Sequence, residues 1–412
     1  MNRLTPAHLQ DLLAARRLGA EARVVVSGNH AVPWTLLRLL DEALPAYRLS
    51  VLNAPAGIPD REGVVHETSF VGAGMRRSGR LAYVPARLSQ VPLLFGTTRA
   101  PDVVLLHVSA PRGSKVSLGI EVNILPAAIE HCRARGGLVL AQVNPQMPYT
   151  FGDGEYDLDT FDGVLEVDEP LASPPARAAQ GHSDAAQIGA QVAARVWDGA
   201  TMQLGIGEVP DAVLPGLTQK RRLGIWSEMF SDGLLSLEAA GALDPERLVV
   251  SSFAFGSSDL YRWLDGNERV RMLRTETVND PAQIARQPQM TSVNTALQVD
   301  LFAQANASRI GARIHSGFGG QTDFIVGALH SPGGQALMAL RSWHPKANVS
   351  TIVPILSEPT TSFQPSAIIT EQGTAEILGQ DERQQASALI ERAAHPDARD
   401  HLRAEARRLG LI

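Results

Sequence analysis

The segment GIWSEMFSDG, residues 224–233, places one carboxylate, Glu228, in an otherwise apolar run of strand length. Apolar side chains lie on both sides of it, ending with Trp226 and resuming at Met229. Burying an unpaired carboxylate costs free energy, so a protein rarely places one there without a reason. Two interpretations stay open, a catalytic carboxylate or a strand-end carboxylate that caps the N-terminus of the following helix.

Two glycine-rich loops could bind the atoms on which such a carboxylate acts. In QLGIGEVPDAV, Gly205 and Gly207 precede a helix, where glycine lets the backbone approach a ligand and the helix N-terminus offers free N–H groups to an anion. In SGFGGQTDF, Gly317, Gly319 and Gly320 lie close together, and their N–H groups could form an oxyanion hole. A tight turn and an irregular loop without a ligand are the alternative interpretations.

Other familiar catalytic and metal-binding motifs are absent from the sequence. It contains no G-x-S-x-G nucleophile elbow, no GxxxxGK[ST] phosphate loop and no H-E-x-x-H motif. The 11 histidines show no metal-ligand spacing. We therefore expect neither a metal site nor a permanently bound cofactor.

The composition narrows the class of protein. The 412 residues are 44% hydrophobic and 19% charged, and the formal net charge of -6 argues against a general nucleic-acid binder. Cys132 is the single cysteine, so no disulfide can form within the chain and a reducing compartment is expected. No apolar run approaches 18 residues, and the N-terminal sequence is typical of a helix capped by Thr5 rather than of a signal peptide. These features predict a cytoplasmic protein without a membrane partner.

The elements that must position these residues alternate along the whole chain. Continuous apolar runs such as DVVLLHVS and LVLAQVN are separated by helical patterns, which predicts mostly parallel sheets covered on both faces. LGIWSEMF, STIVPIL and SAIITEQG are predicted as single strands, and DERQQASALIERAAH as a closing helix. The Pro- and Ala-rich segment 168–184 predicts a linker. We therefore expect an α/β fold with two similar open domains, 1–175 and 183–412, and an active site in the cleft between them.

Taken together and in order, the segments resemble the acetyl-CoA hydrolase/transferase family. The sequences DGATMQLGIGEVPDAVL, LGIWSEMFSDG, MTSVNTALQVDLFAQAN, SGFGGQTDFIVGA and ITEQGTAEILG are similar to its C-terminal half. GRLAYVPARLSQVP and AQVNPQMPYTFGD are similar to its N-terminal half. Within the family, the chain most resembles the 4-hydroxybutyrate CoA-transferase branch of the class I CoA-transferases.

The resemblance implies a mechanism and a set of site residues. Glu228 would attack an acyl-CoA thioester and then carry coenzyme A as a glutamyl thioester, with ping-pong kinetics. The loop Gly205, Ile206, Gly207, Glu208 and Val209 would bind coenzyme A, and Gly317, Gly319 and Gly320 would supply oxyanion donors. Glu371 would orient the pantetheine arm or the attacking carboxylate. Lys346 is either a phosphate contact or an exposed loop lysine.

Several alternatives remain open at this point. Gln372 stands where many relatives carry tyrosine, and SAPRGSKVSLG is a loose match to the family, so the acyl groups are not fixed. An acyl-CoA hydrolase could use the same nucleophile with water as the acceptor. A CoA-binding protein without catalysis and an isomerase of related architecture are more distant alternatives. A homodimer that binds acyl-CoA and small carboxylates is the expected assembly.

Overall fold

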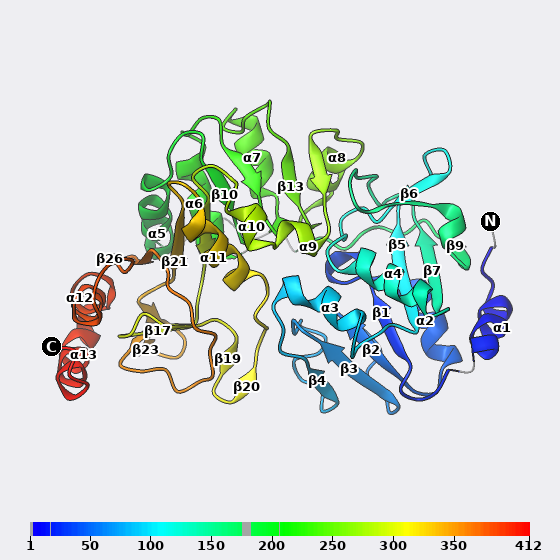
Figure 1. Ribbon diagram of the computed structural model, residues 1–412, viewed down its shortest axis with the longest axis horizontal. Coiled ribbons are helices and arrows are strands. Elements are labelled where there is room, and N and C mark those ends of the chain that lie inside the picture. Colours follow the sequence, from blue (N-terminus) through cyan, green and yellow to red (C-terminus); the bar gives the residue numbers. More distant parts are fainter. Residues whose placement is uncertain (1–2, 17, 175–182, 206) are drawn as a thin grey trace. The chain divides into compact units, whose positions relative to one another are not determined.

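The chain folds into two compact units, which Figure 1 draws as a ribbon. The computed structural model describes residues 3–16, 18–174, 183–205 and 207–412. One unit comprises Met1–Pro175 with Val249–Val278, and the other Ala176–Leu248 with Asn279–Ile412. The predicted domains, 1–175 and 183–412, did not include the assignment of Val249–Val278 to the first unit. The division into these two domains stays a prediction. Residues 175–182 of the predicted linker lie outside the described residues.

The first unit is built on a seven-stranded sheet in the order β4-β3-β2-β1-β5-β7-β9, in which every neighbouring pair is parallel. The central strands β5 and β7 are buried at all six positions, as expected when helices cover both faces. The strands of this unit are β1 (Arg23–Val26), β2 (Tyr47–Val51), β3 (Val64–Thr68), β4 (Leu81–Tyr83), β5 (Val103–Val108), β6 (Lys115–Ser117), β7 (Leu138–Val143), β8 (Glu155–Asp157), β9 (Gly163–Glu166), β13 (Val249–Ser251), β14 (Phe253–Ala254) and β15 (Val270–Met272).

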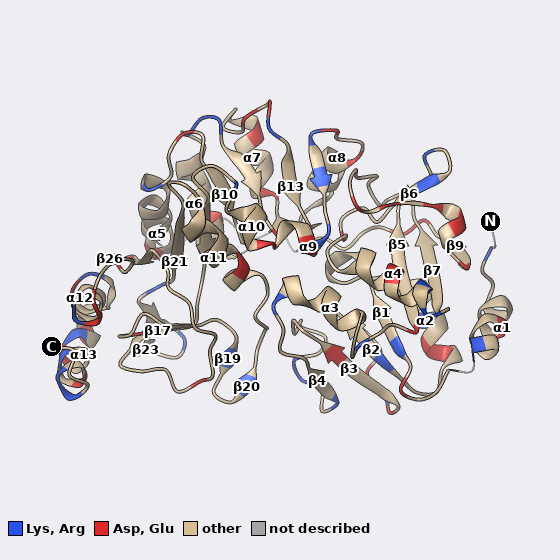
Figure 2. Cartoon of the chain, viewed as in Figure 1, with Lys and Arg blue, Asp and Glu red and all other residues tan. Residues whose placement is uncertain are grey.

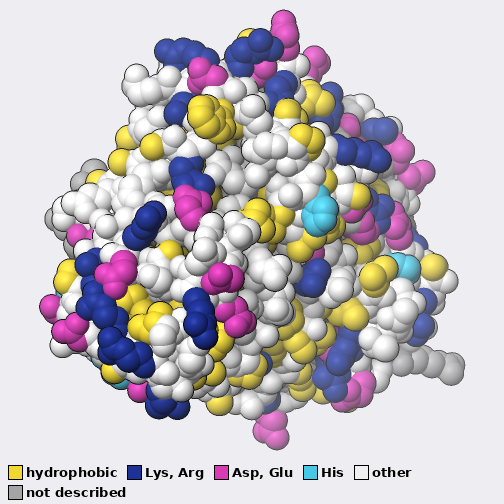
Figure 3. Space-filling model, turned by 60° about the vertical axis from the view of Figure 1, so that its left-hand side comes forward, with side chains coloured by type: hydrophobic (Ala, Val, Ile, Leu, Met, Phe, Trp, Pro, Cys, Tyr) yellow, Lys and Arg dark blue, Asp and Glu magenta, His cyan; other side chains and the backbone are white. Residues whose placement is uncertain are grey.

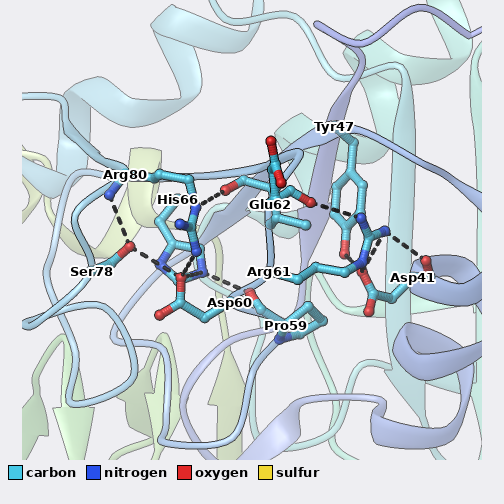
Figure 4. A network of polar contacts seen from close by, with 10 residues as sticks. Asp41, Tyr47, Pro59, Asp60, Arg61, Glu62, His66, Ser78 and Arg80 are labelled. Atoms are coloured by element: carbon cyan, nitrogen blue, oxygen red, sulfur yellow. Dashed lines mark hydrogen bonds and ion pairs between the residues drawn. The ribbon is translucent and has the colours of Figure 1, made fainter.

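Helices and polar loops cover this sheet. Helix α4 packs against β5 and β7, and α2 packs against β7. Figure 4 shows how the loop before β3 is fixed: Arg61 donates to Asp41 and to backbone carbonyls, and Asp60 pairs with Arg80. The helices are α1 (Pro6–Arg16), α2 (Trp34–Ala43), α3 (Val91–Phe95), α4 (Leu125–Ala134), α8 (Ser258–Leu264) and α9 (Thr275–Val278), with short 3-10 turns at Asn29–Ala31, Leu88–Gln90 and Leu158–Thr160.

The second unit contains a second mostly parallel arrangement. Its strands run in the order β11-β10-β16-β21-β25-β26, and only the last pair is antiparallel. Helix α11 packs against β16 and β21, and α5 packs against β21, β25 and β26. The mixed α/β fold class with mostly parallel sheets is therefore confirmed. A position for the active site between the two units stays a prediction.

The remaining elements of the second unit form its helices and small hairpins. The helices are α5 (Ser183–Ala194), α6 (Glu208–Leu217), α7 (Gly233–Ala239), α10 (Pro281–Ile284), α11 (Gln321–His330), α12 (Glu382–Ala388), the π-helical turn η4 (Leu389–Ala393) and α13 (Pro396–Arg408). The strands are β10 (Thr201–Gln203), β11 (Gly224–Trp226), β12 (Met229–Phe230), β16 (Thr291–Asn294), β17 (Gln298–Asp300), β18 (Ala305–Asn306), β19 (Arg309–Ile310), β20 (Arg313–Ile314), β21 (Gln335–Ala339), β22 (Trp343–His344), β23 (Val349–Ser350), β24 (Ile352–Val353), β25 (Ala367–Thr370) and β26 (Gly373–Glu376).

Two of the strands predicted as continuous are interrupted. The run 223–230 breaks at Ser227 and Glu228, because the Ser227 hydroxyl contacts the carbonyl oxygens of Leu204 and Met229 and so replaces regular strand pairing. The run 350–356 contributes only short strands. The predicted closing helix is real, but it ends in η4 and a further helix, α13, follows it.

Charged residues lie mainly on helices and loops, whereas most strand residues are uncharged (Figure 2). On the face that Figure 3 shows, Lys and Arg lie beside Asp and Glu over much of the surface. Within the described ranges, no helix has the length and apolar character needed to cross a membrane.

Candidate active site

The site lies at the carboxyl ends of parallel strands in the second unit. From β10 the chain proceeds to β11 on one side, and β16, β21 and β25 then follow on the other side of β10. Loops that leave two strands in opposite directions open a crevice at this switch point, where open α/β sheets commonly bind ligands. Glu228 lies two residues beyond the end of β11, beside this switch point.

Two donors hold the Glu228 carboxylate. The Asn279 side chain donates through Nδ2 to Glu228 Oε2 over 2.8 Å, and the backbone N–H of Gly320 donates to the same carboxylate. Helix α7 has Asp232 at its N-cap without a side-chain cap hydrogen bond. The capping interpretation of Glu228 is therefore not supported by these contacts.

The electrostatics of Glu228 favour a carboxylate that is only partly ionised near neutrality. The residue keeps some accessible surface, but its carboxyl group is enclosed by protein atoms, and this burial is the main cause that raises its pKa to about 7. The hydrogen bond from Asn279 lowers the pKa, the negative charge of Asp323 raises it, and the Gly320 N–H lowers it. A dehydrated carboxylate with this pKa is a stronger nucleophile and base than one in water.

One glycine of SGFGG, Gly320, meets Glu228 directly. A Cβ atom on Gly320 would overlap Glu228 Oε2 and Asn279 Nδ2 and would lie 2.9 Å from Glu228 Cδ. Gly319 has a φ of 56°, which favours glycine, and Gly317 is buried. Only the contact of Gly320 with Glu228 places this loop at the carboxylate.

The loop GIGEV, residues 205–209, also lies close to the segment SEM, residues 227–229. The Ser227 hydroxyl accepts from the backbone N–H of Leu204, and one pocket is lined by Gly205, Ser227 and Met229 among other residues. Gly207, with a φ of 131°, is the N-cap of α6. Ile206 lies outside the described residues.

The rest of this loop is held by the protein itself. Glu208 is exposed and pairs with Arg341, which follows β21 by two residues, and Val209 is buried. The loop is thereby linked to the end of a second strand of the same sheet.

Glu371 and Lys346 have different surroundings. Burial alone would raise the pKa of Glu371, but hydrogen bonds from the Ser342 hydroxyl and backbone N–H together hold it below its ordinary value. Glu371 follows β25 directly, at the same edge of the sheet as the GIGEV loop. Lys346 is exposed on the turn between β22 and β23, and it forms no ion pair within the described part of the chain. A role for either residue stays a prediction.

The structure adds Asn279 and Asp323, which the sequence did not indicate. Asn279 lies 51 positions from Glu228, in the turn between two short helices, so no local pattern connects them. Asp323 is buried in the first turn of α11. At the switch point, Gln203 Oε1 accepts from Ser292 Oγ over 2.7 Å and from Asn294 over 3.3 Å.

No group of three His, Cys, Asp or Glu side chains within the described ranges is arranged to hold a metal ion. The site instead combines the Glu228 carboxylate, close to the buried Asp323, with neutral N–H donors. Such donors stabilise an oxyanion, so the arrangement suits covalent catalysis by a carboxylate on an acyl group.

Comparisons with known proteins agree with this chemistry. A sequence model of the acetyl-CoA hydrolase/transferase C-terminal domain matches residues 256–406. The chain is 38% identical over 355 residues to 4-hydroxybutyrate coenzyme A transferase of Clostridium kluyveri, covering 82% of this chain and 80% of that protein. It is 36% identical over 408 residues to the succinyl-CoA:acetate/propanoyl-CoA:succinate CoA transferase of Fasciola hepatica, covering 92% and 84%.

A solved structure is also similar over almost its whole length. The crystal structure of 4-hydroxybutyrate CoA-transferase from Porphyromonas gingivalis superposes with a TM-score of 0.79 at 31% sequence identity. The match covers 97% of both chains.

Proposed function

The chain belongs to the acetyl-CoA hydrolase/transferase family, and from this premise we propose that it moves coenzyme A between small carboxylic acids with Glu228 as the covalent nucleophile. It is an enzyme of the CoA-transferase class, as its relatives are. The single observation that carries the role of Glu228 is its enclosed carboxylate, held by Asn279 and the Gly320 N–H.

The proposed reaction begins with attack of a Glu228 oxygen on the thioester carbonyl of an acyl-CoA. The carbon–sulfur bond breaks, which leaves an acyl-glutamyl anhydride and the CoA thiolate. The thiolate then attacks the glutamyl carbonyl, and the bond between the glutamyl carbon and the bridging oxygen of the anhydride breaks. The first carboxylate leaves, and coenzyme A stays on Glu228 as a thioester.

A second carboxylate runs these steps in reverse. It attacks the glutamyl thioester to give a new anhydride and thiolate, and the thiolate then attacks the acyl carbonyl of that anhydride. A new acyl-CoA leaves, and the Glu228 carboxylate is restored. The sequence needs no net proton transfer, which suits a site whose polar contacts to Glu228 are neutral donors.

The donors that hold the carboxylate suit the tetrahedral intermediates on the glutamyl carbon. When that carbon is attacked, negative charge develops on its remaining oxygen, and Asn279 Nδ2 and the Gly320 N–H already face this carboxyl group. Removal of one such donor typically costs about 10²–10³ in kcat. We assign Gly320 as an oxyanion donor, with Gly317 and Gly319 shaping its loop.

We assign coenzyme A to the loop from Gly205 to Val209 and to the strand ends beside it. The backbone of this loop leads into the N-terminus of α6, which favours an anionic ligand. Glu371 would orient the thiol arm, and Lys346 would meet a phosphate.

Trapping of the intermediate tests this assignment. The protein is incubated with acetyl-CoA and then with borohydride or hydroxylamine, and its peptides are analysed by mass spectrometry. We expect modification confined to the peptide that contains Glu228. Turnover without any such modification would overturn the mechanism.

An acyl-CoA hydrolase differs from a CoA-transferase in its acceptor, which is water rather than a carboxylate. Consumption of acetyl-CoA is measured with and without added butyrate. We expect consumption to depend on butyrate and to yield butyryl-CoA, whereas equal consumption without an acceptor carboxylate, with release of free CoA, would establish a hydrolase. A homodimer and a cytoplasmic location stay predictions, to be tested by light scattering and by cell fractionation.

A further inference from the structure

The Asn279 side chain has one polar atom that the protein leaves without a partner. The residue is 0% exposed, and its Nδ2 donates to Glu228 Oε2. Its Oδ1 accepts no hydrogen bond from any described residue. A buried acceptor without a donor costs free energy, and most buried polar atoms in folded proteins are bonded to the protein or to ordered water, so this exception calls for an explanation such as a role in the site.

The identity of the unpartnered atom follows from the carboxylate. Rotating the amide by half a turn would place Oδ1 against Glu228 Oε2, and two acceptors repel each other when Glu228 is ionised. Nδ2 therefore faces Glu228, and Oδ1 is the atom left to accept. Because both atoms are bonded to one carbon, the acceptor lies close to the nucleophile to which Nδ2 donates.

We propose that Asn279 Oδ1 accepts a hydrogen bond from the amide N–H nearest the sulfur of the thiol substrate. This inference rests on the proposed function. Near the reacting centre, the thioester carbonyl, the sulfur and an ionised carboxylic acid offer acceptors but no donor. In coenzyme A the first N–H lies two methylene groups beyond the sulfur, within the same region as the reacting carbon. Asn279 is then a specificity-determining residue, which selects thiols that carry an amide at this distance.

The test compares two butyryl thioesters that differ in one group. Butyryl-N-acetylcysteamine carries the amide N–H, and the butyryl thioester of 2-mercaptoethyl acetate has an ester oxygen in its place. A site that binds an N–H discriminates against an analogue that lacks it, because its acceptor is then left unpaired or faces another acceptor. We expect the wild-type kcat/KM to favour the amide by about 10–100-fold. If the truncated thioesters are not turned over, their inhibition constants against butyryl-CoA give the same ratio.

Variants assign this preference to Asn279. In Asn279→Ala and Asn279→Ser we expect the amide-to-ester ratio to fall to about 1–3, whatever happens to the absolute rates. The control is Asn306→Ala, because Asn306 is equally buried but both of its side-chain polar atoms are bonded within the protein. We expect the ratio of this control to equal that of the wild type.

Each outcome decides the inference separately from the proposed function. A wild-type ratio near one, or an unchanged ratio in both Asn279 variants, overturns the inference and shows that Oδ1 binds water or nothing. A wild-type protein that neither turns over nor binds butyryl-CoA overturns the proposed function itself. Circular dichroism identifies a variant that does not fold, and the other variant then decides.

Discussion

Gly320→Ala tests the site through a single added methyl group. The backbone at Gly320 has a φ of -97°, which alanine adopts without strain, so the effect comes from space alone. The new Cβ would lie 2.9 Å from Glu228 Cδ and would overlap Glu228 Oε2 and Asn279 Nδ2. Carbon atoms normally approach to about 3.5–4.0 Å, so the Glu228 carboxyl group must retreat by roughly 1 Å. A displacement of this size at reacting atoms costs about 10²-fold in rate.

The assay follows transfer of CoA from butyryl-CoA to acetate, by chromatography of the two acyl-CoA species. We expect kcat of Gly320→Ala to fall by about 10²-fold or more, with the far-ultraviolet circular dichroism unchanged. Gly79→Ala is the matched control, because a Cβ there meets nothing within 4 Å and we expect its rate to equal that of the wild type. A Gly320→Ala enzyme within about threefold of wild-type kcat would refute the placement of this loop against the nucleophile.

Three further predictions follow from the surroundings of Glu228. The attacking group must be ionised and its pKa is about 7, so turnover should rise about tenfold from pH 6 to 8 and then level off; a profile that is flat above pH 5 contradicts this. Glu228→Gln should abolish transfer. The raised pKa means that the stability contributed by the protonated carboxyl is complete below pH 4.5 and is lost as the pH rises through about 7. Urea unfolding should therefore show the free energy of unfolding of Glu228→Gln rising by up to about 3 kcal/mol relative to that of the wild type between pH 4.5 and 8. A difference that stays constant with pH would contradict the burial of this carboxyl. Asn279→Ala removes a hydrogen bond that lowers the pKa of Glu228, so the inflection of its pH–rate profile should move above that of the wild type; an unchanged or lower inflection would show that this bond is not made in solution.

Much of the fold could be predicted from local patterns. The six-residue apolar runs that form β5 and β7 are too continuous for a half-exposed sheet, and the structure buries every position. The strand expected over 223–230 was wrong as a continuous element, because hydrophobicity does not reveal a hydroxyl that takes the place of a backbone partner. Ser227 does this, and the resulting break is where Glu228 leaves the strand.

The site itself was only partly accessible to such reasoning. Glu228 was identifiable because it is a charge in an apolar run, and Gly320 because glycines crowd around it. Crowding did not reveal that Gly320 also provides space for the carboxylate, and among the three glycines only Gly319 has a left-handed backbone. Asn279 could not be predicted, because its partner is distant in sequence and its turn resembles many others.

The enclosure of Glu228 has a consequence for the resting enzyme and its covalent form. A Glu228 anion in this environment is penalised by lost hydration. A thioester formed at Glu228 Cδ carries no charge and does not repel Asp323. Formation of the glutamyl-CoA thioester therefore removes the free-energy cost of the buried Glu228 anion, which the free enzyme carries at neutral pH. The carrier state should melt at a higher temperature than the free protein, even before any contact made by the rest of the coenzyme is considered.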